Sequence, residues 1–176
     1  MKFVFPCDEY EQKAIEFIQE FYDHQSEING TGDLDAYLKK ASYAEWLKKV
    51  MRDLDIANIP EGRVPAYTYF YVREEDDKIV GMINIRLALN DFLRKEGGHI
   101  GYSIRPSERK KGYGTSMLNE ALSFCSTIGL RDIMITCDKA NTASAAIIKN
   151  CGGVLECEFY SDAFKTEVQK YTISLT

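Results

Sequence analysis

The most informative stretch of this 176-residue sequence is Ile104-Arg105-Pro106-Ser107-Glu108-Arg109-Lys110-Lys111-Gly112-Tyr113-Gly114-Thr115-Ser116. Four cations lie within seven positions here, although the whole chain carries a net charge of -5. Two glycines follow them directly and open an amphipathic helix. The first turn of a helix leaves backbone N–H groups unpaired, and together they attract an anion. Because Gly112 and Gly114 have no side chains to block that backbone, the stretch predicts a site for a phosphate-bearing ligand, most simply a pyrophosphate.

Two common phosphate-binding motifs do not fit this stretch. A P-loop needs a lysine directly after its last glycine, whereas Gly114 is followed by Thr115. The dinucleotide-binding motif G-x-G-x-x-G would start at Gly112, but its third glycine position is occupied by Met117. From spacing alone, a basic turn that merely caps a helix stays an alternative to a ligand site.

Hydrophobic periodicity on both sides of this stretch predicts one α/β domain of the α+β type, residues 1–176. The expected order is βααβββαβαββ, which gives a mixed, mainly antiparallel central sheet flanked by helices. Ser42 and Glu45 form a capping-box pattern at the start of the second helix. The expected strands are 2–5, 66–73, 78–89, 99–105, 131–138, 154–160 and 168–175. The expected helices are 8–24, 42–54, one that follows Gly114 and ends before Gly129, and 141–151, with a loop at 27–34 and a hairpin turn at 74–77.

The composition is typical of a globular protein, since 45% of the residues are hydrophobic and 28% are charged. The net charge of -5 disfavours nucleic acids and anionic membranes as partners, because both would be repelled. No apolar run approaches the roughly 20 residues that span a bilayer, and the acidic N-terminal stretch does not resemble a signal peptide. The five cysteines show no CxxC spacing and only two histidines accompany them. We therefore expect a cytoplasmic protein with reduced thiols and no metal site.

The segment Arg109-Lys110-Lys111-Gly112-Tyr113-Gly114 resembles the R/Q-x-x-G-x-G/A loop that binds the pyrophosphate of acetyl-CoA in the GNAT N-acetyltransferase superfamily. It follows a strand that ends at a proline and precedes a long helix, as in that family. A second similarity lies at Asn141 to Ser144, which resembles the family's N-x-x-S/A pattern at the start of the next helix. The resemblance covers the coenzyme-binding core, about residues 98–153. It implies an acyl-CoA N-acyltransferase-like fold.

This resemblance also implies which residues hold the coenzyme. The backbone N–H groups from Lys110 to Thr115 would bind the pyrophosphate, and the strand end at Ile104 would pair with the pantetheine arm. Asn141 would hydrogen-bond that arm, or serve as an ordinary helix cap, or both. The complete set is Ile104, Arg109, Lys110, Lys111, Gly112, Tyr113, Gly114, Thr115, Asn141 and Ser144. In the family the strand ending near Ile104 diverges from the one ending near Asp138, which opens a wedge for the thioester.

The candidate acid–base residues are His99, Tyr102 and Tyr160, each of which has a packed or solvated side chain as its alternative reading. Many members of the family carry a tyrosine acid seven residues after the motif asparagine, but that position is Ile148 here. Strand alternation places His99 and Tyr102 on opposite faces, so only one of them can reach the wedge. Two cysteines, Cys137 and Cys151, are possible nucleophiles, but no basic residue adjoins either and the resemblance implies direct transfer.

The function implied by the resemblance is transfer of an acetyl group from acetyl-CoA to a primary amine of a small molecule by direct attack, without a metal. Three acids, Glu27, Asp33 and Asp35, lie where the family's acceptor enters, and would suit a cationic amine unless they are simply solvated. Assembly as a homodimer stays open. One alternative is a non-catalytic acyl-CoA-binding sensor or regulatory module, which Ile148 favours. Another is a protein that binds nucleotide phosphates.

Overall fold

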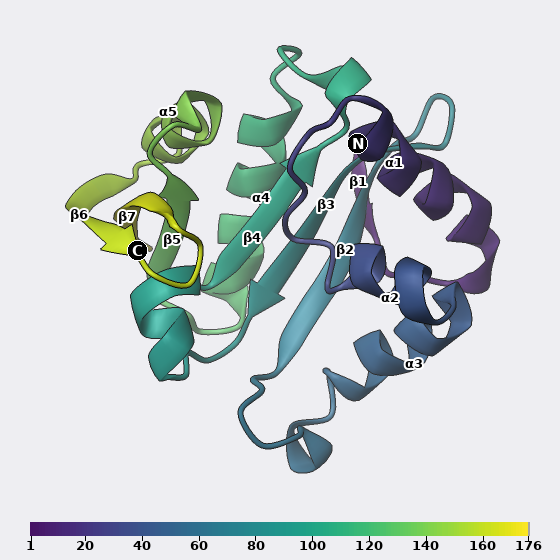
Figure 1. Ribbon diagram of the computed structural model, residues 1–176, viewed down its shortest axis with the longest axis horizontal. Helices are drawn as coiled ribbons and strands as arrows, with labels where there is room; N and C mark the ends of the chain where they lie inside the picture. The colour runs from purple at the N-terminus through teal and green to yellow at the C-terminus, as the bar shows by residue number, and fades with distance from the viewer. Residues whose placement is uncertain (176) are drawn as a thin grey trace.

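The strands form two antiparallel sheets in the computed structural model, which describes residues 1–175 (Figure 1). The first sheet has the order β1-β2-β3-β4, with β1 at Lys2–Val4, β2 at Ala66–Arg73, β3 at Lys78–Arg86 and β4 at Ile100–Ile104. The second sheet has the order β5-β7-β6, with β5 at Asp132–Asp138, β6 at Val154–Ser161 and β7 at Thr166–Ser174. Neighbouring strands are antiparallel in both sheets.

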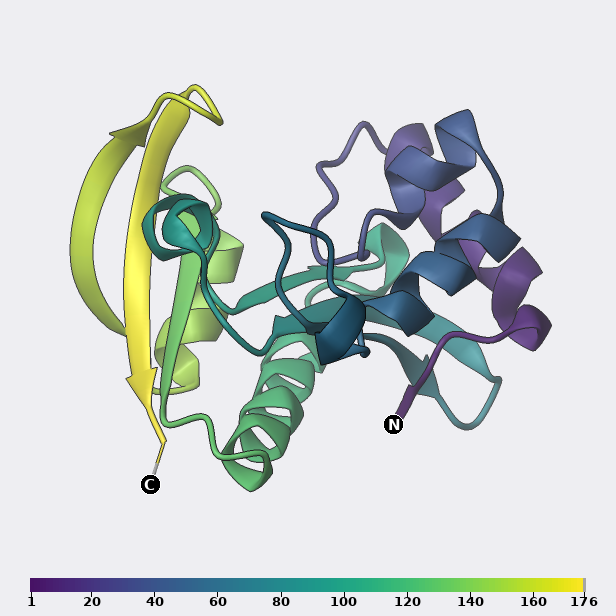
Figure 2. The same cartoon turned by 90° about the horizontal axis from the view of Figure 1, so that it is seen from below.

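Helices cover both faces of the first sheet (Figure 2). One face carries α1 (Glu11–Asp23), α2 (Leu34–Lys40) and α3 (Tyr43–Arg52), which bury a cluster that includes Phe17, Trp46 and Phe70. The opposite face carries α4 (Tyr113–Thr127), and α5 (Thr142–Asn150) packs beside α4 and β5. A second buried cluster joins α4 and α5 to both sheets. The two sheets therefore belong to one domain, held together by this shared core.

Most of the predicted elements and the predicted fold class are confirmed. Ser42 caps α3 as predicted, because its Oγ accepts from the Glu45 N–H at 3.2 Å. The other half of the capping box differs, since Glu45 Oε2 accepts from the Ser42 hydroxyl at 3.2 Å and not from its backbone N–H. Residues 74–77 make the predicted hairpin turn, although the strand expected at 78–89 ends at Arg86. Helix α2 is not predicted by the sequence pattern. Only Leu34 of this short helix is buried, so there is no apolar stripe for periodicity to detect.

The predicted single mixed sheet is in fact divided between β4 and β5. An isolated bridge joins Gly98 to Ile135, and the His99 N–H donates to the Met134 carbonyl at 2.7 Å. Beyond this point β4 pairs only with β3, and β5 pairs only with β7. Figure 2 shows the second sheet standing apart from the first. The strands are thus joined at one end and diverge at the other, with a free edge of each on the side of the gap.

Three further features of the fold concern membranes, metal ions and the cysteines. None of the helices within residues 1–175 is both long and apolar enough to cross a membrane. The same residues contain no group of three or more His, Cys, Asp or Glu side chains arranged to hold a metal ion. All five cysteines are free thiols.

Candidate active-site cleft

A cleft of about 1100 Å³ lies between the diverging strands. Four segments supply most of its lining: residues 25–30 after α1, β4, residues 108–115 around the start of α4, and residues 136–144 where β5 leads into α5. The predicted coenzyme residues that line it are Ile104, Arg109, Lys110, Gly112, Tyr113, Gly114, Thr115, Asn141 and Ser144. Lys111 is the exception. The structure thus brings together, around one cavity, segments that are more than 100 residues apart in the sequence.

One end of the cleft is formed by the loop before α4. Lys110 has φ +62° and Gly112 has φ +82°, so the chain turns sharply into the helix. Within the described residues, none of the backbone N–H groups from Lys110 to Thr115 donates to another group of the protein, and the first helical bond there runs from Ser116 N to Gly112 O. Unpaired N–H groups at a helix N-terminus make a site for an anion. The geometry therefore fits a phosphate-bearing ligand.

The carboxylate of Glu108 fastens this loop to the first sheet. It accepts from Lys111 and Lys78 at 2.8 Å each and from Arg73 at 2.9 Å, and it is almost fully buried. Burial alone would raise the pKa of Glu108, but these three cations outweigh it and lower the pKa to about 2. The Lys111 charge is committed to this contact, which explains why its side chain does not line the cleft.

The two other cations of the loop behave differently from each other. The Arg109 Nε donates to the Ile104 carbonyl at 3.1 Å and its Nη2 to Ser26 Oγ at 2.7 Å, while its guanidinium lies over the Phe21 ring. Arg109 therefore ties the loop to β4 and to the end of α1. Lys110 is exposed, lines the cleft and has no ion-pair partner among the described residues. Its ammonium is free to meet a phosphate.

Gly114 serves packing as well as access. A Cβ at this buried position would meet Ile147 Cδ1 at 2.5 Å, closer than ordinary van der Waals contact. By contrast, a Cβ at Gly112 would meet nothing within 4 Å. Gly112 is therefore favoured by its left-handed backbone alone, whereas Gly114 lets the start of α4 approach α5 closely.

The backbone of β4 offers an edge to the cleft. In an antiparallel pair, alternate residues direct their N–H and C=O groups to the partner strand. The Arg86 N–H donates to His99 O and the Arg105 N–H donates to Val80 O, both at 2.8 Å, so the odd-numbered residues of β4 face β3. The backbone groups of Ile100, Tyr102 and Ile104 consequently face the cleft.

Two hydroxyl groups meet beside this edge. Tyr102 Oη and Ser144 Oγ lie 3.0 Å apart, which brings β4 and α5 together across the cleft. Burial raises the pKa of Tyr102, so its hydroxyl stays protonated at neutral pH. Asn141 Oδ1 accepts from the Ser144 N–H at 3.0 Å, which confirms Asn141 as the helix cap and leaves its amide nitrogen to the cleft. Burial also raises the pKa of the Cys137 thiol nearby, which disfavours a thiolate nucleophile.

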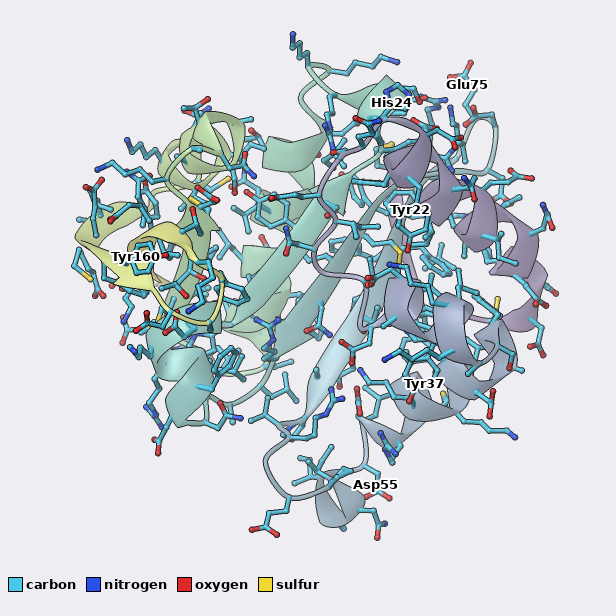
Figure 3. All side chains as sticks on the ribbon, viewed as in Figure 1. Tyr22, His24, Tyr37, Asp55, Glu75 and Tyr160 are labelled. Atoms are coloured by element: carbon cyan, nitrogen blue, oxygen red, sulfur yellow. The ribbon has the colours of Figure 1, made fainter. Side chains whose placement is uncertain are left out.

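The structure separates the other two acid–base candidates from the cleft. The Met134 N–H donates to His99 Nδ1 at 2.9 Å, so this imidazole holds β5 at the point where the sheets join. Burial, together with the charges of Arg86 and Arg94, lowers the pKa of His99 and keeps it neutral. Tyr160 is exposed on the β6–β7 hairpin, on the other side of the molecule from Tyr22 (Figure 3). Of the three candidates, only Tyr102 lines the cleft.

The three acids expected near the acceptor also differ in their position relative to the cleft. Glu27 is exposed and lines the cleft. Asp33 instead pairs with Lys49 at 3.2 Å and with Arg63 at 3.0 Å, and Asp35 accepts from Thr31 Oγ1 at 2.6 Å. Neither of these two lines the cleft. Only Glu27 is thus placed to meet a cationic group of an acceptor.

Comparison with known proteins decides the family. A model of the acetyltransferase (GNAT) domain matches residues 15–154, which is well over half of the chain. The chain belongs to the GNAT acetyltransferase family. This confirms the resemblance and the assignment of the protein to the acyltransferases.

Solved structures of the family share the fold at low sequence identity. The microcin C7 self-immunity acetyltransferase MccE, in complex with acetyl-CoA and AMP, superposes with a TM-score of 0.71 at 16% identity, over 98% of this chain and 91% of that one. RimL, a ribosomal L7/L12 α-N-protein acetyltransferase in complex with coenzyme A, gives 0.71 and 16%, over 98% and 93%. A chimera of the Vibrio cholerae spermidine N-acetyltransferase SpeG gives 0.67 and 14%, over 99% and 96%. No curated protein sequence matches this chain significantly.

Two cleft residues of this GNAT protein were not found from the sequence. Arg86, at the end of β3, donates from Nη1 to the carbonyls of Gly97 and Gly98 at 3.1 and 2.9 Å. Glu96 is buried at 4% exposure, and its Oε2 has no hydrogen-bond partner among the described residues. Both line the cleft at the end away from the phosphate loop. Neither residue belongs to a motif. The only signal in the sequence was that Arg86, a charged residue, follows the apolar residues of the predicted strand 78–89.

Proposed function

We propose that the protein transfers an acetyl group from acetyl-CoA to the primary amine of a small molecule. The observation that carries this proposal is the set of unpaired N–H groups from Lys110 to Thr115, placed next to the free edge of β4. The MccE and RimL structures, which hold acetyl-CoA or coenzyme A, support it. A cytoplasmic location, without a nucleic-acid or membrane partner, is part of the same proposal.

In this proposal the coenzyme lies along the cleft. Its pyrophosphate accepts from the N–H groups of the loop, and the free ammonium of Lys110 adds charge there. The amide groups of the pantetheine arm pair with the cleft-facing backbone of Ile104, as an added strand would. Since the Asn141 Oδ1 is occupied by the Ser144 N–H, the Asn141 amide nitrogen is the group that donates to the arm.

The acetyl group then stands near the middle of β4. A neutral amine nitrogen of the acceptor attacks the thioester carbonyl carbon, and negative charge develops on the carbonyl oxygen. The cleft-facing N–H group of Tyr102 is a fixed donor for that oxygen, and one such donor contributes about 3–4 kcal/mol to the transition state. Collapse of the intermediate forms the amide and breaks the carbon–sulfur bond.

The departing thiolate needs a proton, and the acetylated nitrogen must lose one. The Tyr102 hydroxyl is protonated and lies inside the cleft, so we assign it the proton that goes to sulfur. Because a thiol has an ordinary pKa of about 8.5, its thiolate is already a fair leaving group, and the acid adds less than positioning does. The nitrogen releases its proton to the solvent of the open cleft, and the Tyr102 phenolate takes a proton back from that solvent, which restores the enzyme. We assign no catalytic role to His99 or Tyr160.

The test couples coenzyme binding to turnover. We expect coenzyme A to bind in isothermal titration, and acetyl-CoA to release thiol only when a suitable amine from a broad panel is present. Binding without thiol release for any amine would favour a non-catalytic acyl-CoA-binding module. Displacement of coenzyme A by ATP in a thermal-shift assay would instead favour a nucleotide binder.

A further inference from the structure

Arg86 lies on the face of the first sheet that the loop after α1 covers. Side chains alternate between the two faces of a sheet, so Arg86 shares a face with Gly101, whereas Tyr102 points to the other. A Cβ at Gly101 would lie 3.6 Å from Arg86 Nη2 and 3.4 Å from the backbone of Gly30, which belongs to the cleft-lining loop after α1. The guanidinium therefore lies at the wall of the cleft, under the segment that follows α1.

Only one of the three nitrogen atoms of the Arg86 guanidinium donates a hydrogen bond to the described residues. Both contacts that it makes use Nη1, which donates to the carbonyls of Gly97 and Gly98. Its Nε and Nη2 have no hydrogen-bond partner among the described residues. These two groups form one edge of the planar fork, which is the edge that binds a carboxylate through two parallel bonds.

Its charge also lacks a counter-ion. Among the described arginines that are not fully exposed, Arg73 pairs with Glu108 and Arg105 pairs with Glu20, but Arg86 has no carboxylate within ion-pair distance. The acid whose field reaches it, Asp33, is already shared by two other cations. Burying a cation without a partner is costly unless a ligand supplies the anion.

The coenzyme phosphates are too distant to be that anion. Arg86 is opposite His99, five residues before Ile104, where the phosphate loop is attached. At about 3.3 Å per residue, the two ends of the strand are roughly 16 Å apart. The group that Arg86 binds therefore comes with the acceptor.

We propose that Arg86 binds a carboxylate of the acceptor, so that the acceptor is an amine that also carries a carboxylate, such as an amino acid, and not a polyamine. This inference rests on the proposed acetyl transfer. Exposed Glu27 also lines the cleft, so its carboxylate can meet the amine of such a molecule. The cleft thus selects a molecule with both charges.

The experiment compares matched acceptors and matched variants. Amino acids, their primary amides, amines with a phosphate group and spermidine are assayed for acetyl-CoA-dependent thiol release. We expect the best amino acid to exceed its own primary amide by at least about 30-fold in kcat/KM. The amide has no carboxylate, so it cannot form the charge pair with Arg86. Arg86→Gln should abolish this preference through KM, and Arg86→Lys should restore it in part. Arg94→Gln, which removes an exposed arginine nearby, should keep it.

The outcomes separate this inference from the proposed function. If amides or spermidine react as well as amino acids, or if the preference survives in Arg86→Gln, the carboxylate site is wrong although acetyl transfer stands. Preference for the phosphate-bearing amine would also overturn it. If no amine of the panel supports thiol release, the proposed function itself is refuted. Titration of coenzyme A into each variant checks that the fold and the coenzyme site are intact, and Arg86→Lys serves if Arg86→Gln does not fold.

Discussion

Replacing Gly112 by glutamate tests the coenzyme site most directly. A Cβ at this position meets no atom within 4 Å, so the side chain fits, but its φ of +82° costs a non-glycine residue about 1 kcal/mol. A carboxylate at a helix N-terminus returns up to about 1 kcal/mol. We therefore expect little change in the free energy of unfolding. The new charge, however, occupies the anion site.

The loss of binding can be worked out from Coulomb's law. A carboxylate about 5 Å from a diphosphate with two charges costs about 2 kcal/mol under the screening of water and several times more where solvent is partly excluded. The Kd for coenzyme A should therefore rise at least about 20-fold in isothermal titration. Gly112→Asn, which tolerates the left-handed backbone without adding charge, is the control and should bind within about fivefold of wild type. Affinity equal to wild type in Gly112→Glu would refute the placement of the pyrophosphate on this loop.

Three further predictions concern single side chains. Tyr102→Phe should lower kcat about tenfold or more while the Kd for coenzyme A stays unchanged, and an unaltered kcat would remove Tyr102 as the acid. Glu108→Gln should cost about 2 kcal/mol of unfolding free energy at neutral pH by urea titration, since the pKa of about 2 lies well below the ordinary value and exposed partners screen the pair. The wild type should lose this stability as the pH falls from about 4.5 to 2, and a variant as stable as wild type at pH 7 would contradict the account. Glu96→Gln should raise KM for the amine about tenfold without changing coenzyme affinity, because it removes a negative charge from the cleft wall; an unchanged KM would exclude a role of this charge in binding the acceptor.

The loop at one end of the cleft, where we propose that the coenzyme phosphates bind, could be predicted because its structure is local in the sequence. Consecutive residues supply the N–H groups, the turn and the helix start, so a short motif contains the whole anion site. The role of each cation could not be read in the same way. Lys110 and Lys111 are neighbours of one type, and only the position of Glu108, held by strands far away in the sequence, commits Lys111 to a structural ion pair.

The acceptor end could not be predicted, because distant segments build it. The division of the sheet depends on β5 choosing β7 as its partner, a pairing between residues more than 25 positions apart. Arg86 becomes a ligand candidate only when its neighbours leave one edge of the guanidinium unpaired. His99 illustrates the reverse case. Its residue type suggested acid–base chemistry, but its contact with Met134 gives it a structural task.

The net charge of -5 does not decide what the cleft binds. At physiological ionic strength, charges separated by more than about 8 Å are largely screened, so the sum over the chain matters for approach and the nearest groups matter for binding. The nearest acid at the phosphate loop, Glu108, is neutralised by three cations. The unpaired groups at the phosphate loop are the ammonium of Lys110 and the backbone N–H groups. At the opposite end of the cleft, the unpaired group is the Nε and Nη2 edge of the Arg86 guanidinium. An acidic protein can therefore repel long polyanions at a distance and still offer, at contact range, the two anion sites that we propose for the coenzyme and for its acceptor.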